Sequence, residues 1–153
     1  MSGYRQLGVD PPRVLVFGAT NEELFENAAF AMFDQAYVIG ELAPTYSRPV
    51  VAPGDTLEEL LNNWLDELLY VSEQERLVWS SFVVDRLEEG GVQGSASGMP
   101  IADTAVRPRM ITGLAEPAPA PVPVPEGWWV ELRFAAVPRI GGEGPASFEE
   151  SGN

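Results

Sequence analysis

The stretch from Thr56 to Val71, TLEELLNNWLDELLYV, places the strongest constraint on the fold of this chain. Its apolar residues recur at intervals of three and four, so they share one wide face of a helix. They are Leu57, Leu60, Leu61, Trp64, Leu65, Leu68 and Val71. Thr56 and Glu59 have the spacing of a capping box, in which the two side chains satisfy free N–H groups at the helix start. The stretch therefore predicts a capped core helix.

A second capped helix is predicted from Asn21 to Phe33, directly after a strand from Arg13 to Phe17. Thr20 and Glu23 repeat the capping-box spacing at its start. The apolar residues of this helix form two neighbouring rows with a spacing of four. These rows are Leu24, Ala28 and Met32, and Phe25, Ala29 and Phe33. We expect the helix to pack on a sheet through both rows.

The remaining regular structure is predicted as strands. They are an edge strand over Tyr46–Ala52, a strand over Leu77–Leu87, its weak partner over Val92–Ser97, and strands over Arg107–Leu114 and Trp128–Val137. The run 88–91 is predicted as a hairpin turn and the run 73–75 as a connection. The pattern predicts an α+β fold: a compact single domain with two capped helices on one side of a mainly antiparallel sheet of about six strands.

A proline-rich segment interrupts this pattern at 117–125, PAPAPVPVP. Alternating prolines favour an extended polyproline conformation and exclude both a helix and a strand ladder. We expect a stiff surface connector, with a ligand for a proline-reading module as the alternative. Residues 138–153 are rich in Gly, Pro, Glu and Ser and predict a flexible acidic tail. The predicted domain is therefore 1–137, with the connector inside it.

The composition excludes several kinds of chemistry. The chain has no Cys and no His, and all nine of its basic residues are arginines. It therefore lacks a thiolate, an imidazole and a lysine amine, and its carboxylates suit hard cations such as Ca²⁺ or Mg²⁺. The formal net charge of −14 disfavours direct nucleic-acid binding and suits either docking on a basic protein or simple solubility. Without a long apolar run or a signal-peptide core, we expect a cytoplasmic protein with no membrane segment.

Both helical stretches resemble a known family. NEELFENAAFAMFD at 21–34, followed by TLEELLNNWLDELLYV at 56–71, resembles the two helices of the archease family in order, spacing and wording. Phe82–Val84 and Thr112–Leu114 are similar to two of the family's strand regions, so the resemblance spans roughly 4–137. It implies a compact α+β accessory protein that promotes guanylylation and turnover of the ligase in RNA and tRNA splicing without being an enzyme itself. It also implies an acidic cluster that binds a divalent cation, calcium in some members.

The acidic positions of the family are mostly replaced in this chain. Asp10 stands for the first family Asp only with a one-residue slip, and Asp103 matches the second acidic stretch only with relaxed spacing. These two residues are the candidate metal ligands. The Asp that the resemblance implies in the last strand falls on Ala136 or Ala135. Since Ca²⁺ takes about 6–8 oxygen ligands, we expect the calcium site to be weakened or lost.

Each of the three candidate site residues, Asp10, Asp103 and Arg107, leaves a second interpretation open. Arg107 stands where the family has a Lys, which makes it a candidate contact to a nucleotide or partner, and Thr112 stands where the family has a His. Asp10 precedes two prolines and is more simply a turn residue, whereas Asp103 is equally well a solvated loop acid. Arg107 is more often a surface arginine than a nucleotide contact.

Two functions follow from the resemblance. The first is an archease-like accessory protein whose partner is the RNA-splicing ligase. The alternative is an archease-fold binding module that has lost the metal site and serves another protein. An independent carboxylate enzyme has less support, because no pair of acids has a catalytic spacing.

Overall fold

The computed structural model describes residues 3–139, which hold two α-helices, eight strands and a short 3₁₀ helix. In chain order these are β1 (Tyr4–Val9), β2 (Pro12–Gly18), α1 (Asn21–Asp34), β3 (Tyr46–Gly54), α2 (Leu57–Glu75), β4 (Leu77–Glu88), β5 (Gly90–Pro100), η1 (Ile101–Asp103), β6 (Arg109–Leu114), β7 (Val122–Val124) and β8 (Gly127–Pro138). The predicted α+β class, with two capped helices on antiparallel strands, is confirmed. The tail predicted for 138–153 lies largely outside the described residues.

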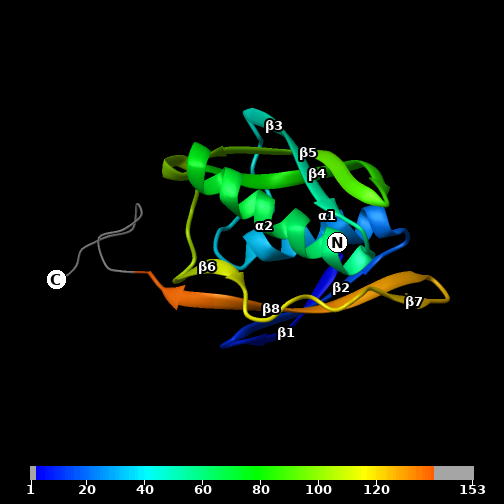
Figure 1. Ribbon diagram of the computed structural model, residues 1–153. Coiled ribbons are helices and arrows are strands. Elements are labelled where there is room, and N and C mark those ends of the chain that lie inside the picture. Colours follow the sequence, from blue (N-terminus) through cyan, green and yellow to red (C-terminus); the bar gives the residue numbers. More distant parts are fainter. Residues whose placement is uncertain (1–2, 140–153) are drawn as a thin grey trace.

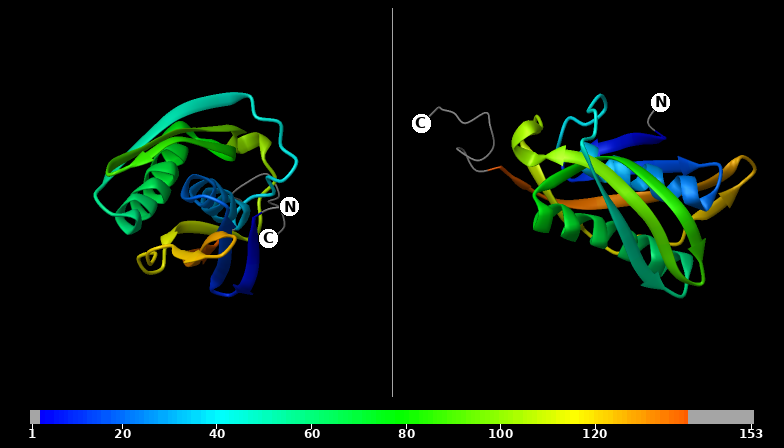
Figure 2. Two further views of the ribbon diagram at one scale, coloured as in Figure 1. Left: turned by 90° about the vertical axis from the view of Figure 1, so that its right-hand side faces the viewer. Right: turned by 90° about the horizontal axis from the view of Figure 1, so that it is seen from above.

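The strands form two antiparallel sheets, whereas the sequence pattern predicts one. The first sheet has the order β1-β2-β8-β6, with β7 paired to β8, and the second has the order β3-β5-β4. Both helices lie between the sheets, as Figures 1 and 2 show. The helices therefore have a sheet on either side, and this arrangement explains why their apolar faces are so wide.

Helix α1 is buried on both of its predicted rows. Its buried residues are Leu24, Phe25, Ala28, Ala29, Ala31, Met32 and Phe33. The Thr20 side chain accepts a hydrogen bond from the N–H group of Glu23 (3.1 Å), and the Glu23 carboxylate accepts one from Ala19 (2.5 Å). Glu26 reaches β4, where its carboxylate accepts a hydrogen bond from the N–H group of Val84 (2.8 Å). This bond satisfies a donor on the edge of the second sheet.

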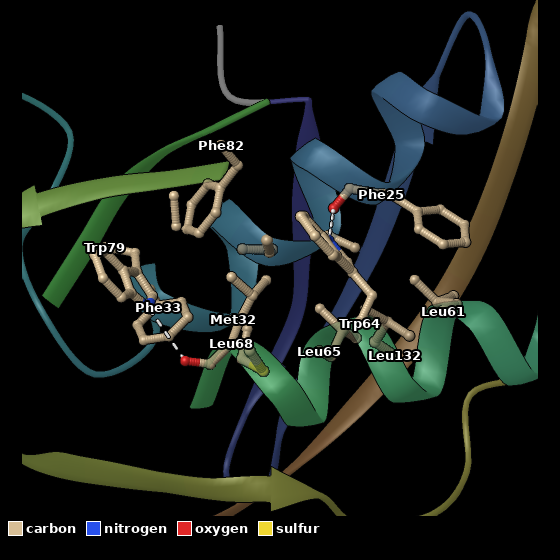
Figure 3. Packing of buried hydrophobic residues seen from close by; sticks show 14 of the residues in the cluster. Phe25, Met32, Phe33, Leu61, Trp64, Leu65, Leu68, Trp79, Phe82 and Leu132 are labelled. Carbon is tan, nitrogen blue, oxygen red and sulfur yellow. Dashed lines mark hydrogen bonds between the residues drawn. The ribbon is translucent and has the colours of Figure 1, made fainter. Parts of the chain in front are cut away.

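Helix α2 joins the core through two tryptophans (Figure 3). The Trp64 indole N–H donates to the carbonyl oxygen of Phe25 in α1, and the Trp79 indole N–H donates to that of Leu68, each at 3.1 Å. Both rings are fully buried, so these bonds satisfy indole donors that burial removes from water. The helix continues to Glu75, so the predicted connection at 73–75 is wrong. Arg76 ends it in the left-handed conformation, with a φ of 57°.

Strand β5 is the central strand of its sheet and not a weak partner. It pairs with β3 on one side and β4 on the other. A Cβ atom on Gly94 would lie 2.1 Å from the Val83 carbonyl oxygen, and one on Gly98 would lie 1.9 Å from that of Val78. The small residues that weaken the strand pattern therefore allow β4 to approach closely.

Two segments of the first sheet differ from the prediction. Strand β1 was not predicted, and it pairs with β2 along the edge of the sheet. The proline-rich connector was predicted to exclude a ladder, but Val122–Val124 forms β7 and pairs with β8. This strand lies at the end of a short hairpin, where proline is tolerated because its missing N–H group can face away from the partner strand. Figure 1 shows β7 running beside β8.

Candidate functional site

The three candidate residues from the sequence do not meet at one place. Asp10 lies in the exposed turn between β1 and β2 of the first sheet. Asp103 is exposed at the end of η1, which follows the central strand of the second sheet. Arg107 lies before β6 and reaches the carboxyl end of α1. The structure therefore separates the two acids, and of the three candidates only Arg107 lies at the end of α1.

Arg107 is held by that end of the helix. Its Nε atom donates to the carbonyl oxygens of Asp34 (2.5 Å) and Tyr37 (3.2 Å). Its terminal nitrogen forms an ion pair with the Asp34 carboxylate (3.1 Å). A guanidinium at this position is favoured, because the last carbonyl groups of a helix are unpaired and carry partial negative charge.

Tyr4 completes the contacts of Asp34 from strand β1. Its hydroxyl donates to the second oxygen of the Asp34 carboxylate. Burial, and then the hydrogen bond to Asp34, raise the pKa of the Tyr4 hydroxyl well above its ordinary value. The tyrosine therefore stays neutral and remains a donor, while Asp34 binds a phenol on one oxygen and a guanidinium on the other.

A second group of polar contacts surrounds Gln35, which is 1% exposed. Its amide exchanges two hydrogen bonds with Gln6 of β1, at 2.9 Å and 3.0 Å. Its oxygen also accepts from Arg109 of β6 (2.9 Å). The Nε atom of Arg109 is buried and has no hydrogen-bond partner within residues 3–139. The described residues therefore satisfy only part of the hydrogen-bonding capacity of Arg109.

Arg139 closes the network from the end of β8. It donates to the carbonyl oxygens of Ala36 and Arg107, each at 2.7 Å. Its guanidinium also lies 4.9 Å from the centre of the Tyr37 ring, a cation–π distance. Arginines 107, 109 and 139 thus surround a helix end whose own last turn has no basic residue.

This network is suited to holding the fold together. The Asp34 carboxylate and the Arg107 and Arg139 guanidiniums are already bound to groups of the protein. The network links β1, the end of α1, the segment before β6 and the end of β8. Arg107 binds Asp34 and Tyr37 of its own chain. Its role as a contact to a nucleotide or partner stays a prediction.

The residues present do not fit the calcium site that the resemblance implies. Asp10 and Asp103 are single exposed carboxylates, one in a turn of the first sheet and one in η1 after the second sheet, and each supplies at most two oxygens. Ala135 and Ala136, at the expected place of a further acid, pair with Gly113 and Ile111 of β6 and carry no side-chain oxygen. Across residues 3–139, no group of three or more Asp, Glu, His or Cys side chains could hold a metal ion. A calcium site needs more oxygen ligands than these acids supply.

The space next to the network is small. A cavity of about 130 Å³ lies between the end of α1, α2 and β6, with mostly apolar lining that includes Met32, Tyr37 and Met110. Binding sites for drug-sized ligands are typically about 300–1,000 Å³. The cavity is therefore too small to enclose a nucleotide.

The sequence pattern does not mark several residues of this network: Tyr4, Gln6, Asp34, Gln35, Arg109 and Arg139. Asp34 and Arg107 are 73 residues apart in the chain, and Ala36 and Arg139 are 103 apart. No local spacing marks such pairs. The one available signal is the last turn of α1, whose missing basic residue indicates that another segment must bind its carbonyl groups.

Comparison with known proteins defines the class to which this scaffold belongs. The profile of the "Archease protein family (MTH1598/TM1083)" matches residues 13–111, which run from β2 into β6. The chain belongs to the archease protein family.

Curated relatives agree with this assignment over part of their length. The chain is 40% identical over 73 residues to "Protein archease" of Methanosarcina barkeri, covering 48% of this chain and 50% of that protein. It is 39% identical over 90 residues to the Methanosarcina acetivorans protein of the same name, covering 56% and 62%. The chain thus spans half to about three-fifths of the length of these relatives.

A solved structure resembles the fold over nearly the whole chain. The solution structure of Protein 1598 of Methanobacterium thermoautotrophicum matches with a TM-score of 0.72 at 25% identity. The match covers 91% of this chain and all of that one. Neither helix in the described part of our chain is long and apolar enough to cross a membrane.

Proposed function

We propose that this protein is a non-catalytic accessory factor of an RNA-splicing ligase and promotes guanylylation and turnover of that ligase. The observation that carries the proposal is the family match, which covers both capped helices and the strands around them. The net charge of −14 adds support, because it suits association with a protein partner more than direct binding of RNA. The cytoplasm is the compartment we propose for this role.

The proposed role does not depend on a calcium site built from Asp10 and Asp103. Those acids are separated, and Asp34 is occupied by Tyr4 and Arg107. Stimulation of the ligase would then come from protein contact, with the ligase supplying its own metal ions. Arg107 would contribute by holding the end of α1 in place.

The contacts at the end of α1 and the lack of a metal-binding group in the described residues favour a second function. Arginines bind the end of α1, and among residues 3–139 no group of three or more acidic, His or Cys side chains could hold a metal ion. Such an archease-fold module is also suited to another protein partner. In that case the scaffold would be retained while the ligase-specific role was lost.

A guanylylation assay separates these two functions. The RNA-splicing ligase of the same organism is incubated with labelled GTP and Mn²⁺ or Mg²⁺, with and without this protein, and covalent label on the ligase is measured over time. We expect faster labelling and several ligation turnovers per ligase when the protein is present. Bovine serum albumin at equal concentration is the control for non-specific protection.

The result also decides the role of calcium. Equal stimulation with added Ca²⁺ and with a Ca²⁺-selective chelator supports the calcium-independent proposal. Stimulation that requires Ca²⁺ would contradict that part alone, whereas no stimulation under any condition would exclude the activator role and favour the second function.

A further inference from the structure

The outer face of the first sheet combines aromatic side chains with arginines: Phe17 is exposed, and Trp129 is partly buried. Val14, Val16, Val130 and Leu132 face the helices and are at most 1% exposed. Because side chains alternate along a strand, the residues between them face the opposite way. In Figures 1 and 2 both helices lie on the inner side of this sheet, and no element within residues 3–139 covers its outer side.

Strand register places the outer residues in ordered rows. Phe17 pairs with Trp129, which in turn pairs with Val122, so an apolar row crosses β2, β8 and β7. Phe17 is 42% exposed and Val122 is 40% exposed. Two residues along β2, Leu15 pairs with Glu131, and two further along, Arg13 pairs with Arg133. We name Arg13, Leu15, Phe17, Val122, Trp129 and Arg133 the outer patch.

The row formed by Arg13 and Arg133 is held by weak ion pairs within the protein. Arg13 and Arg133 lie opposite each other, and like charges at such positions are unfavourable. They share the carboxylate of Glu131, at 3.6 Å and 3.8 Å from their Nε atoms, which is longer than a hydrogen bond. Within the described residues the Nε atom of Arg13 is buried and has no hydrogen-bond partner, and one terminal nitrogen donates to the Leu7 carbonyl oxygen at the long distance of 3.5 Å. A partner would therefore meet the terminal nitrogens of Arg13, whose side chain is 40% exposed. Another carboxylate placed on this row would gain charge-assisted hydrogen bonds from both guanidiniums.

The aromatic row ends at an open hollow of about 470 Å³. Phe17, Trp128 and Trp129 line it together with Glu23 and Glu126. Tryptophan and arginine are among the residue types that contribute most to protein–protein binding. The hollow has room for an apolar side chain of a partner, which Trp129 and Phe17 would contact on one side.

We propose that the outer patch is the surface on which a protein partner docks, and this rests on the proposed accessory function. The partner segment would place an apolar side chain at Phe17 and Trp129 and a carboxylate at Arg13 and Arg133. These two positions are about 13 Å apart, four residues along a strand, so the segment is an extended one with the two side chains four residues apart.

Charge favours a protein over RNA as the occupant. Arginines beside aromatic rings also bind single-stranded nucleic acid. Here, however, Glu131 lies between the two rows and Glu23 and Glu126 line the hollow, so phosphate groups would meet carboxylates along the patch. The net charge of −14 adds long-range repulsion of RNA. The positive charge of the patch is confined to the row of Arg13 and Arg133, and this position fixes the orientation of a partner that carries a single carboxylate.

Binding of the full chain to the RNA-splicing ligase of the same organism tests the proposal. Biolayer interferometry compares the wild type with Trp129→Ser and with the double variant Arg13→Gln/Arg133→Gln. We expect each to raise the Kd about tenfold or more, as is typical of central interface residues. Tyr70→Ser on α2 and Arg86→Gln on β4 are matched controls, because both residues are exposed on other surfaces, and their Kd should stay within about twofold.

Circular dichroism and thermal unfolding establish that each variant is folded. Tight wild-type binding that the outer-patch variants leave unchanged would overturn the docking surface while the accessory function stands. No wild-type binding would overturn both. A single-stranded RNA 12-mer serves as a second probe: if it binds and the variants weaken that binding alone, the patch is a nucleic-acid surface and the proposal is wrong.

Discussion

At the scale of single residues, the most informative group is the carboxylate of Asp34. It lies at the end of α1 and binds the Tyr4 hydroxyl and the Arg107 guanidinium. A half-buried carboxylate without such partners would lose hydration with no compensation. The two partners come from a strand before the helix and from a segment 73 residues after it. One acid therefore connects three parts of the chain.

The raised pKa of Tyr4 predicts how stability depends on alkaline pH. Unfolded tyrosine loses its proton near pH 10, while the folded Tyr4 hydroxyl keeps it to higher pH. Above pH 10 the unfolded state then binds fewer protons than the folded state. The contribution of Tyr4 to the free energy of unfolding is therefore fully present below pH 10 and falls above it, by at most about 1.4 kcal/mol per pH unit. The chain has no Lys and no Cys, so few other groups titrate in this range.

Urea unfolding between about pH 9 and pH 11.5 measures this effect. Tyr4→Phe should lower stability at neutral pH by about 1 kcal/mol, because it removes a hydrogen bond, and should flatten the alkaline decline. Tyr70→Phe is the control, since Tyr70 is 58% exposed. An alkaline decline of equal slope in wild type and Tyr4→Phe would show that Tyr4 is not its source.

At the scale of elements, strand β5 shows why a weak local pattern can mark a central strand. Val92 and Ala96 are fully buried, and Gly94 between them faces Trp64 and the backbone of β4. Val84 of β4 pairs with Gly94 beside a register shift, and the carbonyl group of the preceding Val83 lies closest to Gly94. A larger side chain there would push the two strands apart.

Gly94→Ala should therefore destabilise the protein strongly. The added Cβ would lie 2.1 Å from the Val83 carbonyl oxygen and 3.1 Å from the Trp64 ring. We expect a loss of about 2–3 kcal/mol and a Tm lower by about 5–10 °C. Gly91→Ala is the matched control on the same strand, because its Cβ would meet only an ordinary contact at 3.5 Å. A similar Tm for the two variants would contradict this account of β5.

At the scale of the whole molecule, the protein holds its layers together without an acidic metal centre in its described part. Arginines from two distant segments bind the end of α1, and Glu26 binds the edge of β4. These contacts connect α1 to both sheets. They provide cross-links that require no bound cation.

This arrangement predicts little response of stability to calcium. A specific site at 100 times its Kd would stabilise the protein by about 2.7 kcal/mol and raise the Tm by about 5–10 °C. At about 5 mM Ca²⁺ we expect the Tm to match that in Mg²⁺ of equal concentration to within about 1 °C. The Mg²⁺ control is needed because a chain of net charge −14 gains stability from any added cation. A rise specific to Ca²⁺ that Asp10→Asn or Asp103→Asn abolishes would show that these acids bind it.

Both helices and most strands were predictable, because their signals are local. The caps join residues three or four apart, and the alternating residues of β8 predict its buried face. The predictions that failed have different causes. Helix α2 continues through the run 73–75, and the prolines of β7 hide a short hairpin with β8. The pairing of β7 depends on where the hairpin places Val122 against Trp129, and the second sheet depends on the path of the chain after α1.

The candidate site was harder to predict than the fold. Asp10, Asp103 and Arg107 came from positions in a family pattern, and the structure separates the two acids. The residues that gather around α1 have no common spacing, because the contact of Arg107 with Asp34 exists only once β1, β6 and β8 have assembled.

The sequence by itself determined two capped helices, the faces of the strands, the family and a set of side chains restricted to carboxylates, hydroxyls and arginines. Helical and strand periods arise from the backbone within a few residues, so they can be read locally. Only the tertiary structure decided that the helices lie between two sheets, that three arginines surround the end of α1, and that Arg13 and Arg133 share the outer face of the first sheet with Trp129. Those features depend on long-range strand register, which local residue patterns do not specify.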